Sequence, residues 1–503
     1  MGARRRAPSP RGRPRRPRAR PTSRGWPRRV RARRGARNSP DRPAWPLLLP
    51  GDPVTFNRTG LRSPSSCGPL RRGGEHGQGL RRRLLSSRIP CRVGALALAV
   101  LACVAHGDVA PGDRITAENV ERVKDLVSPG LEWCIRRGFP LTIVETRRII
   151  WPQAYKEATE KYAQQVRLGA DGLSLKDYVA GLPFPNLQPN DPQLAIKIMW
   201  NYNHNFFATD DLDARNFDAD TGTIADHGPM SVERHFLLDH FRRLWWIGRL
   251  YVDPKPEKTP NPAGYELQQG LYPILEPYDV KGVGFVSNRY LDFAKQDDAW
   301  LYLPALRRIR RLSTAQRSDA LFGQDTDVDS YGGYAGQVAW MDWKYLGERD
   351  LLAMVHGEHF PVKWNEKVDW AFDDVWEKRR VHVVEGVSKL PQYAFGKRVL
   401  FIDKEAWGIP YSDIYDRSGE LWKIWINDVA IRKQILPGAI EYPEERIFAP
   451  AIVMVDMQLE HATKASLPSL RFPDEQGWYF NQGEQAGITD DWFTVAALVN
   501  AGH

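Results

Sequence analysis

The chain has 503 residues, of which 42% are hydrophobic and 26% charged, so it can form one large domain or a few ordinary ones with a sizeable core. Its net charge of +10 is unevenly placed: residues 1–100 carry 26 arginines and three acidic residues, whereas residues 101–503 carry 45 basic and 58 acidic residues. The later part is therefore acidic, with a net charge of −13, which argues against a nucleic-acid-binding protein because such proteins need a basic folded surface.

Residues 1–80 carry none of the patterns that a folded domain needs. The first 50 residues include 17 arginines and ten prolines, and their apolar residues do not recur at a helix or strand period. A segment of this composition buries too little apolar surface to offset the entropy lost on folding. We expect it to be disordered, either as a basic arm for nucleic acid or anionic lipid, or as upstream sequence read from a misassigned start.

Residues 81–107 have the three parts of a secretory signal peptide. Five arginines between 81 and 92 precede the uncharged run Val93–Ala105, and small residues stand at Ala105 and Gly107, just before Asp108. The uncharged run is shorter than the ~20 residues of a membrane-spanning helix. We expect export by this internal signal peptide, a true start near residue 80, and Asp108 as the mature N-terminus.

The cysteines leave two hypotheses open for the mature end. Val100–Cys103 resembles a lipobox, which would be cleaved before Cys103 and acylated there. With cleavage after Gly107, Cys134 is the only cysteine left, so no internal disulfide is expected, and its apolar surroundings indicate a buried thiol. Both hypotheses place the protein beyond the inner membrane, and acylation at Cys103 would attach it to a membrane.

Helices are expected in the first part of the mature chain, residues 108–216. Thr116 is positioned to cap one helix, and Tyr155 begins a run whose apolar residues recur at helical spacing. Asp191 provides a cap before Pro192 at the first position of a third helix. No segment of the mature chain has the 18 consecutive apolar residues of a membrane-spanning helix.

From residue 217 to residue 503 the sequence changes to strands joined by turns. The run 217–224 contains Thr-Gly-Thr, which signals a tight hairpin turn, and Gly419 stands at the left-handed position of another turn. Residues rich in β-branched and aromatic side chains mark strands at 243–252, 282–293, 299–303, 307–312, 380–387, 398–403, 412–415, 420–427 and 451–458. This pattern predicts an α+β fold with one large curved antiparallel β-sheet, in the same domain as the helices.

The motifs of common enzymes and metal sites are missing or incomplete. The sequence has no GxSxG, P-loop, HExxH or GxGxxG. His356 and His359 are three residues apart and enclose Gly357, whereas a zinc-binding helix needs a spacing of four. Residues 325–330 begin like a calcium loop, but an EF-hand needs Gly where Ser330 stands, so only a looser calcium site remains open. We expect no cofactor, no metal and no enzyme activity.

Aromatic residues are the main candidates for ligand binding. Residues 108–503 contain 16 tryptophans, and several stand close together in expected strands. A sheet curved around them would form an apolar hollow suited to a lipid or another hydrophobic small molecule, whereas the alternative is ordinary core packing. The candidates are Trp245, Trp246, Trp340, Trp343, Trp422 and Trp425.

The arginine-rich run 307–311 is the densest positive charge in the acidic part of the chain. Strand alternation places Arg308 and Arg310 on one face, where they could meet the phosphate or carboxylate of a ligand at a cavity mouth. The alternative is a charged edge strand that resists aggregation.

Several long motifs resemble one bacterial family. They are Ala180–Pro185 followed by Met199–Tyr202, then Leu301–Leu312, Arg317–Ser330 and Tyr411–Trp422. On these motifs, the chain from about residue 115 onward resembles the domain-of-unknown-function family 1329. The resemblance implies an exported Gram-negative protein whose sheet is an incomplete barrel similar to LolA and LolB, with N-terminal helices against its concave face. It implies no established catalytic or binding residues.

The resemblance also suggests a function. Members of the family are often encountered alongside efflux-type inner-membrane transporters and outer-membrane proteins. Our hypothesis is a periplasmic binding or shuttle protein for lipids or other hydrophobic molecules, with helices near 155–202 covering the cavity. The alternatives are a structural protein associated with the outer membrane that binds no ligand, and an unrecognised hydrolase. A large cavity would favour the first, a filled core the second, and a cleft with converging acids the third.

Overall fold

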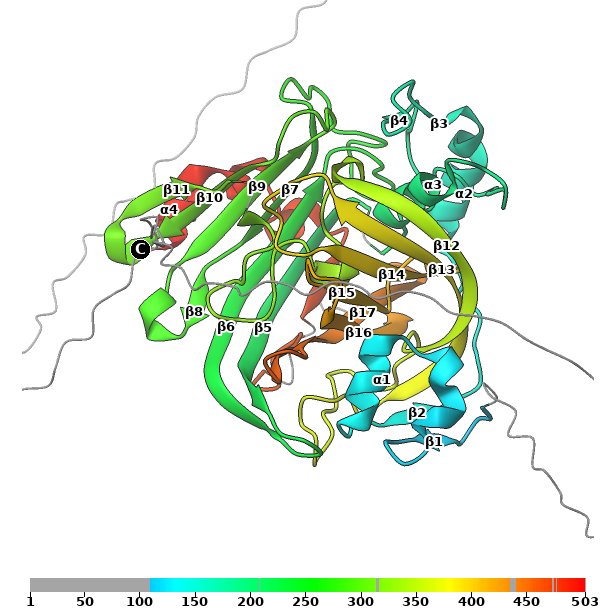
Figure 1. The fold of residues 1–503 in the computed structure, drawn as a ribbon. Helices are drawn as coiled ribbons and strands as arrows, with labels where there is room; N and C mark the ends of the chain where they lie inside the picture. Colours follow the sequence, from blue (N-terminus) through cyan, green and yellow to red (C-terminus); the bar gives the residue numbers. More distant parts are fainter. Residues whose placement is uncertain are drawn as a thin grey trace, which may run out of the picture. The chain divides into compact units, whose positions relative to one another are not determined.

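The sheet of this protein curves on itself to form an incomplete barrel (Figure 1). The computed structural model describes residues 109–503 except 208, 314–315, 435–439, 473–474, 476 and 503. The expected disordered segment 1–80 and signal peptide 81–107 therefore lie outside the described residues. Seventeen strands belong to the sheet, which confirms the α+β fold with a large antiparallel sheet.

The strands pair in one continuous antiparallel series that runs from β11 to β12. In spatial order the series is β11 (Arg308–Arg311), β10 (Asp298–Leu303), β9 (Gly284–Tyr290), β7 (Tyr265–Leu271), β6 (Met230–Trp245), β5 (Asp211–Ile224), β18 (His461–Ser466), β17 (Glu445–Asp456), β16 (Leu421–Lys433), β15 (Tyr411–Tyr415), β14 (Lys397–Asp403), β13 (Val375–Ser388) and β12 (Met341–Ala353). Over the described residues no pairing joins β11 to β12, so the barrel stays open.

Short strands pair with inner members of this series. β8 (Ile274–Glu276) pairs with β6, and β19 (Trp478–Phe480) pairs with β5. β2 (Leu141–Ile143) joins β1 (Arg114–Ile115) to β13, and β3 (Arg167–Leu168) with β4 (Leu175–Lys176) forms a separate ribbon.

Two strand predictions are wrong in detail. Residues 217–224 form no hairpin, because β5 runs through them and Gly222 lies at a bulge, where a Cβ would come within 2.0 Å of the Ser231 carbonyl oxygen. The strand expected at 243–252 ends at Trp245. The Trp246 N–H still donates to the Glu266 carbonyl on β7, but beyond it side chains hold the backbone. Asp210 accepts from the N–H groups of residues 250–252, and Arg249 donates to four carbonyl groups. The turn at Gly419 is confirmed, with φ at +91°.

The helices lie on both faces of the sheet. They are α1 (Pro129–Arg136), α2 (Gln153–Tyr162), α3 (Leu194–Asn203) and α4 (Val495–Ala501), and the helix expected from Thr116 is a 3-10 turn at Val120–Leu126. α1 packs against the face that carries Ile424 and Ile426, whereas α2 and α3 pack with the layer that contains Trp425. Of the helices expected against the concave face, α2 and α3 thus lie on that side of the sheet, while α1 lies on the opposite face.

A buried carboxyl joins α1 to the sheet. Ser128 caps the helix by accepting from the Leu131 N–H, and its hydroxyl donates to Asp413 on β15 at 2.8 Å. The Gly130 N–H donates to the other oxygen of Asp413 at 3.2 Å. Burial raises the pKa of Asp413 to about 7, although these hydrogen bonds oppose the shift. Cys134, on the same helix, is buried, as its sequence context predicts.

Replacing Asp413 with Asn should remove part of the pH dependence of stability. The pKa of about 7 exceeds that of an unfolded Asp, ~4, so the folded chain holds a proton that the unfolded chain releases. The contribution of this group to the free energy of unfolding therefore falls as the pH rises from about 4 to about 7. Urea denaturation at about pH 5 and at about pH 8 measures the free energy of unfolding at each pH. Between these two pH values, the wild type should lose more of this free energy than D413N does. Equal losses would contradict this assignment.

Candidate functional site

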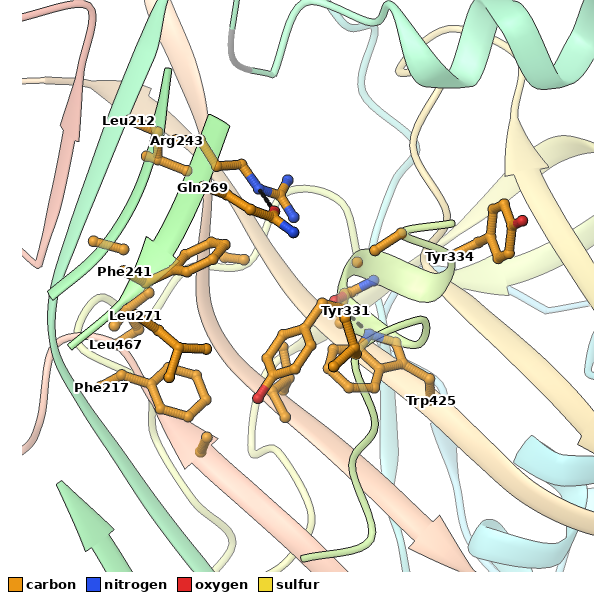
Figure 2. Close-up of a pocket in the computed structure, with 18 of the residues that line it drawn as sticks. Leu212, Phe217, Phe241, Arg243, Gln269, Leu271, Tyr331, Tyr334, Trp425 and Leu467 are labelled. Atoms are coloured by element: carbon orange, nitrogen blue, oxygen red, sulfur yellow. Dashed lines mark hydrogen bonds between the residues drawn. The ribbon is translucent and has the colours of Figure 1, made fainter. Parts of the chain in front are cut away.

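The curved sheet encloses a cavity of about 590 Å³, within the range of ~300–1,000 Å³ that small-molecule sites occupy. Its wall follows strand alternation: Phe241, Arg243 and Trp245 on β6 face it, as do Leu267, Gln269 and Leu271 on the neighbouring β7. Figure 2 shows Phe217, Phe241 and Leu271 on one side of the space, with Tyr331 and Trp425 across from them.

Most of the lining is apolar. The side chains that share this character are Phe207, Leu212, Ala214, Phe217, Phe236, Leu237, Leu238, Phe241, Trp245, Leu267, Leu271, Ile274, Phe285, Leu301, Leu312, Ala320, Leu321, Phe322, Val328, Ala335, Met354, Val355, Ala406, Ile409, Pro410, Trp425, Val429, Ile447, Ala449, Ala451, Ile452, Ala465, Leu467 and Trp478. They come from segments up to 271 residues apart, since residues 207 and 478 both contribute.

Residues 312–336, which we call the inner segment, supply the largest share of the lining among the described parts of the chain. Tyr202 and Asn203, at the end of α3, add to it, and the Tyr202 hydroxyl donates to the Tyr334 carbonyl oxygen at 2.5 Å. The helices near 155–202 therefore contribute one end of α3 to the cavity, and a loop provides most of the cover that these helices were expected to give.

Buried ion pairs hold the inner segment in place. Arg317 donates to Asp297 at 3.0 Å and to Asp329 at 2.6 Å, and Arg289 on β9 approaches Asp297 at 3.1 Å. Burial alone would lower the pKa of Arg317, but the charges of Asp329 and Asp297 outweigh it and raise that pKa. The Arg317 guanidinium also lies 4.5 Å from the centre of the Trp340 ring.

The carboxylates of the calcium-like run bind protein groups. Asp325 pairs with His461 at 2.8 Å, Asp327 with Arg398 at 3.3 Å, and Asp329 accepts from the hydroxyl of Tyr393. The three side chains thus point to different partners, of which His461 and Arg398 lie on the sheet and Tyr393 in the loop before β14. They fasten the inner segment to β18 and β14, which gives this motif a structural explanation.

Two of the six candidate tryptophans line the cavity, Trp245 and Trp425. Trp246 faces away and donates to Gln268 at 2.9 Å. The indole N–H groups of Trp343 and Trp422 donate to the Val338 carbonyl and to Asp456. Trp340 packs under Arg317, so it supports the inner segment from behind.

The structure places Arg308 and Arg310 on an exposed edge strand. All four residues of β11 are exposed, and none of them belongs to the cavity lining. Arg307 adopts φ of +49° before the strand begins, and Arg311 pairs with Asp298. The arginines that reach the cavity are instead Arg243 and Arg289. Sequence reasoning missed both, because alternation along a strand defines two faces but does not tell which face of β6 or β9 lines the cavity.

The histidine pair binds separate carboxylates. His356 contacts Glu377, and His359 lies 3.1 Å from Asp374. Across the described residues no group of three or more His, Cys, Asp or Glu side chains is placed to hold a metal ion.

The acids with raised pKa values do not converge on the cavity. Burial raises the pKa of Asp211 to about 6 and that of Asp413 to about 7, and it also raises the pKa values of Glu266, Asp327 and Asp428. None of these five acids is a lining residue. The acids that do line the cavity are Asp319 and Asp403, and Asp403 accepts from Arg379 at 2.8 Å. This arrangement gives no support to the hydrolase alternative.

Comparison with known proteins identifies the family. A family model described as a protein of unknown function (DUF1329) matches residues 114–498, so the chain belongs to that family, as its motifs predict. No curated protein matches the chain.

Solved structures similar to this chain include the following three. An outer membrane lipoprotein-sorting protein domain from Vibrio parahaemolyticus is 17% identical over 58% of this chain and 92% of its own, with a TM-score of 0.38. A DUF1329 family protein from Desulfovibrio piger is 14% identical, with the same coverages and a TM-score of 0.37. A LolA superfamily protein from Nitrosomonas europaea is 16% identical over 60% and 98%, with a TM-score of 0.35.

Replacing Arg317 with Met should destabilise the fold strongly. The substitution removes a buried cation from Asp297 and Asp329, and breaking such a pair costs about 3–5 kcal/mol. Arg311→Met is the matched control, because its side chain is 70% exposed and an exposed ion pair contributes at most about 1 kcal/mol. Urea denaturation of both variants measures the difference, and similar losses would refute the structural role given to the inner segment.

Proposed function

We propose that this protein binds and shuttles lipids or other hydrophobic molecules in the periplasm and is not an enzyme. The observation that carries the proposal is the apolar cavity of about 590 Å³ inside an otherwise packed domain. Phe217, Phe241, Leu271 and Trp245 are only half-buried, since part of each side chain faces the cavity. Each methylene of a ligand that moves from water into such a site contributes about 0.8 kcal/mol.

The cavity supports this function over the alternative of a structural protein that binds no ligand. A purely structural domain gains stability by filling its core, whereas here large side chains from distant segments surround an open space. The ion pairs of Arg317 and Arg398 hold the inner segment in the position that leaves this space open.

We extend the proposal to the proteins and membranes between which the ligand would move. An exported protein of this family would receive its ligand from an efflux-type inner-membrane transporter and deliver it to the outer membrane or a protein there. In the part of the chain that the structure describes, no helix is long and apolar enough to cross a membrane. Cross-linking in the native cell should recover such a transporter, and failure to recover any inner-membrane protein would contradict this part of the proposal.

Native mass spectrometry of the protein purified from its own host tests the binding function directly. We expect a mass increase that organic solvent removes, with a lipid or another apolar molecule in the extract. A protein that carries no such molecule and binds no apolar probe in titration would contradict the function.

Replacing Ala449 with Trp should block the cavity. Ala449 lines it from β17 and is half-buried, so the indole would occupy ligand space rather than displace packed core atoms. Displacing two methylenes of a ligand costs about 1.6 kcal/mol, which weakens binding more than tenfold. Titration calorimetry with dodecanol measures the change. The control is Val387→Trp on β13, whose side chain is 41% exposed and outside the lining. Equal affinities of the two variants would show that dodecanol binds elsewhere.

A further inference from the structure

Arg243 presents a charged group to the apolar cavity. It stands between Phe241 and Trp245 on the inward face of β6, and Figure 2 shows its side chain reaching into the space beside Gln269. Its Nε donates to Gln269 Oε1 at 3.1 Å, across the register pair that joins β6 to β7. Within the described residues this is its only hydrogen bond, and no carboxylate lies within 4.0 Å of it.

The remaining donors of this pair face the cavity. A guanidinium has five N–H groups and accepts no hydrogen bond, so four N–H groups of Arg243 stay available. For the same reason Gln269 must offer its oxygen to Arg243, which leaves its NH₂ group as a free donor. Both side chains are lining residues, so these donors are presented to the cavity, and no carboxylate among the described residues accepts from Arg243.

The neighbouring charges are already balanced. Arg289, Arg317 and Arg398 share the cluster with Asp297, Asp327 and Asp329, three cations with three anions. Glu266, the acid on β7, accepts from Asn203 at 3.1 Å. Burial lowers the pKa of Arg243 to about 10, and the nearby charge of Arg289 adds to this effect, so Arg243 is still charged at neutral pH.

We propose that Arg243 and Gln269 form a head-group site for an oxyanion, so that the cavity binds an amphiphile with a carboxylate or phosphate at one end. This inference rests on the proposed binding function and specifies its ligand class. The guanidinium fork matches either oxyanion with two parallel hydrogen bonds, and the Gln269 NH₂ group adds a third donor. The apolar chain then lies against Phe217, Leu271 and Trp425, which face the same space.

The physical basis is the cost of an unpaired charge beside apolar surface. A guanidinium in such a wall loses hydration that Gln269 alone does not replace. A ligand oxyanion restores the lost interaction, whereas a neutral ligand of the same chain length leaves it unmade. The cavity therefore discriminates between two ligands with equal apolar surface.

Titration calorimetry on the full chain tests this with three probes that share one alkyl chain: dodecanoate, dodecyl phosphate and dodecanol. The wild type should bind the two anions about ten- to a hundredfold more tightly than the alcohol, the usual effect of charged hydrogen bonds. The ratio of the two anion affinities shows whether a carboxylate or a phosphate is the preferred head group.

Two substitutions then identify the site. Arg243→Met should remove the preference for both anions while leaving dodecanol binding unchanged. Gln269→Glu should do the same by a different route, because the new carboxylate pairs with Arg243 and competes with the ligand. The second variant keeps the test valid if the first one folds poorly. Arg308→Met, on the exposed strand β11, is the control and should change no affinity.

The failures are distinguishable. If wild type binds the alcohol and both anions equally, the cavity binds apolar molecules but has no head-group site, which overturns this inference alone. If R243M and Q269E lower the affinity for all three probes equally, Arg243 serves the fold, which also overturns it. If none of the probes binds to the wild type, the proposed function fails and this inference fails with it.

Discussion

The cavity depends on a buried network of ion pairs that holds the inner segment against the sheet. Arg317 bridges Asp297 and Asp329, and Arg398 pairs with Asp327 while it donates to Tyr393. Removing charges from water is costly, so a network of this kind is retained only where its partners are all present. Here it holds a long loop in one position, with buried aspartates in the network and apolar side chains such as Leu321, Phe322 and Val328 facing the cavity.

Because the aspartates of that network pair with other arginines, Arg243 has no internal carboxylate partner among the described residues. Arg289, Arg317 and Arg398 use the available aspartates, and Arg289 also donates to the Ala335 carbonyl. Arg242, the preceding residue on β6, faces the opposite side of the sheet and pairs with Asp213 at 3.1 Å. Two adjacent arginines on one strand thus have opposite environments, one with an internal carboxylate and one open to a ligand.

The sequence predicts much of the fold because the signals are local. Asp191 with Pro192 marks the start of α3 within three residues, and Gly419 marks its turn. The cavity depends on contacts that no local signal reports, since β5 pairs with β18 across more than 230 residues. Strand parity decides which side chains face inward. The strand expected at 243–252 left out Phe241, because β6 extends from Met230 to Trp245. It contained Arg243, but with Trp245 and Trp246 both as candidates on opposite faces, it did not decide which face Arg243 shares with the cavity.

The arginine-rich run 307–311 was expected at the cavity mouth, and its place in the sheet could not be read from local sequence either. Five neighbouring charges at 307–311 are conspicuous in the sequence, but β11 is the edge of the sheet and solvates them. A head-group site needs few charges in an apolar setting, since water weakens each charge on an exposed strand. A single arginine among Phe241, Trp245 and Gln269 satisfies this condition better than an exposed cluster does.

The two halves of the sheet differ in how their inner faces are covered, and this difference explains why a ligand fits the architecture. Over β13–β17 both faces are packed, with α1 outside and the layer of α2 and α3 inside. On β9, Val286 packs with α4 on the outer side, while Phe285 faces the cavity. In this half an apolar molecule would take the place that helices take in the other. A molecule that binds only the folded chain stabilises the fold, and more so as its concentration rises above its Kd. On the proposed function, a ligand would therefore be the packing partner that this apolar, half-buried wall lacks within the described residues.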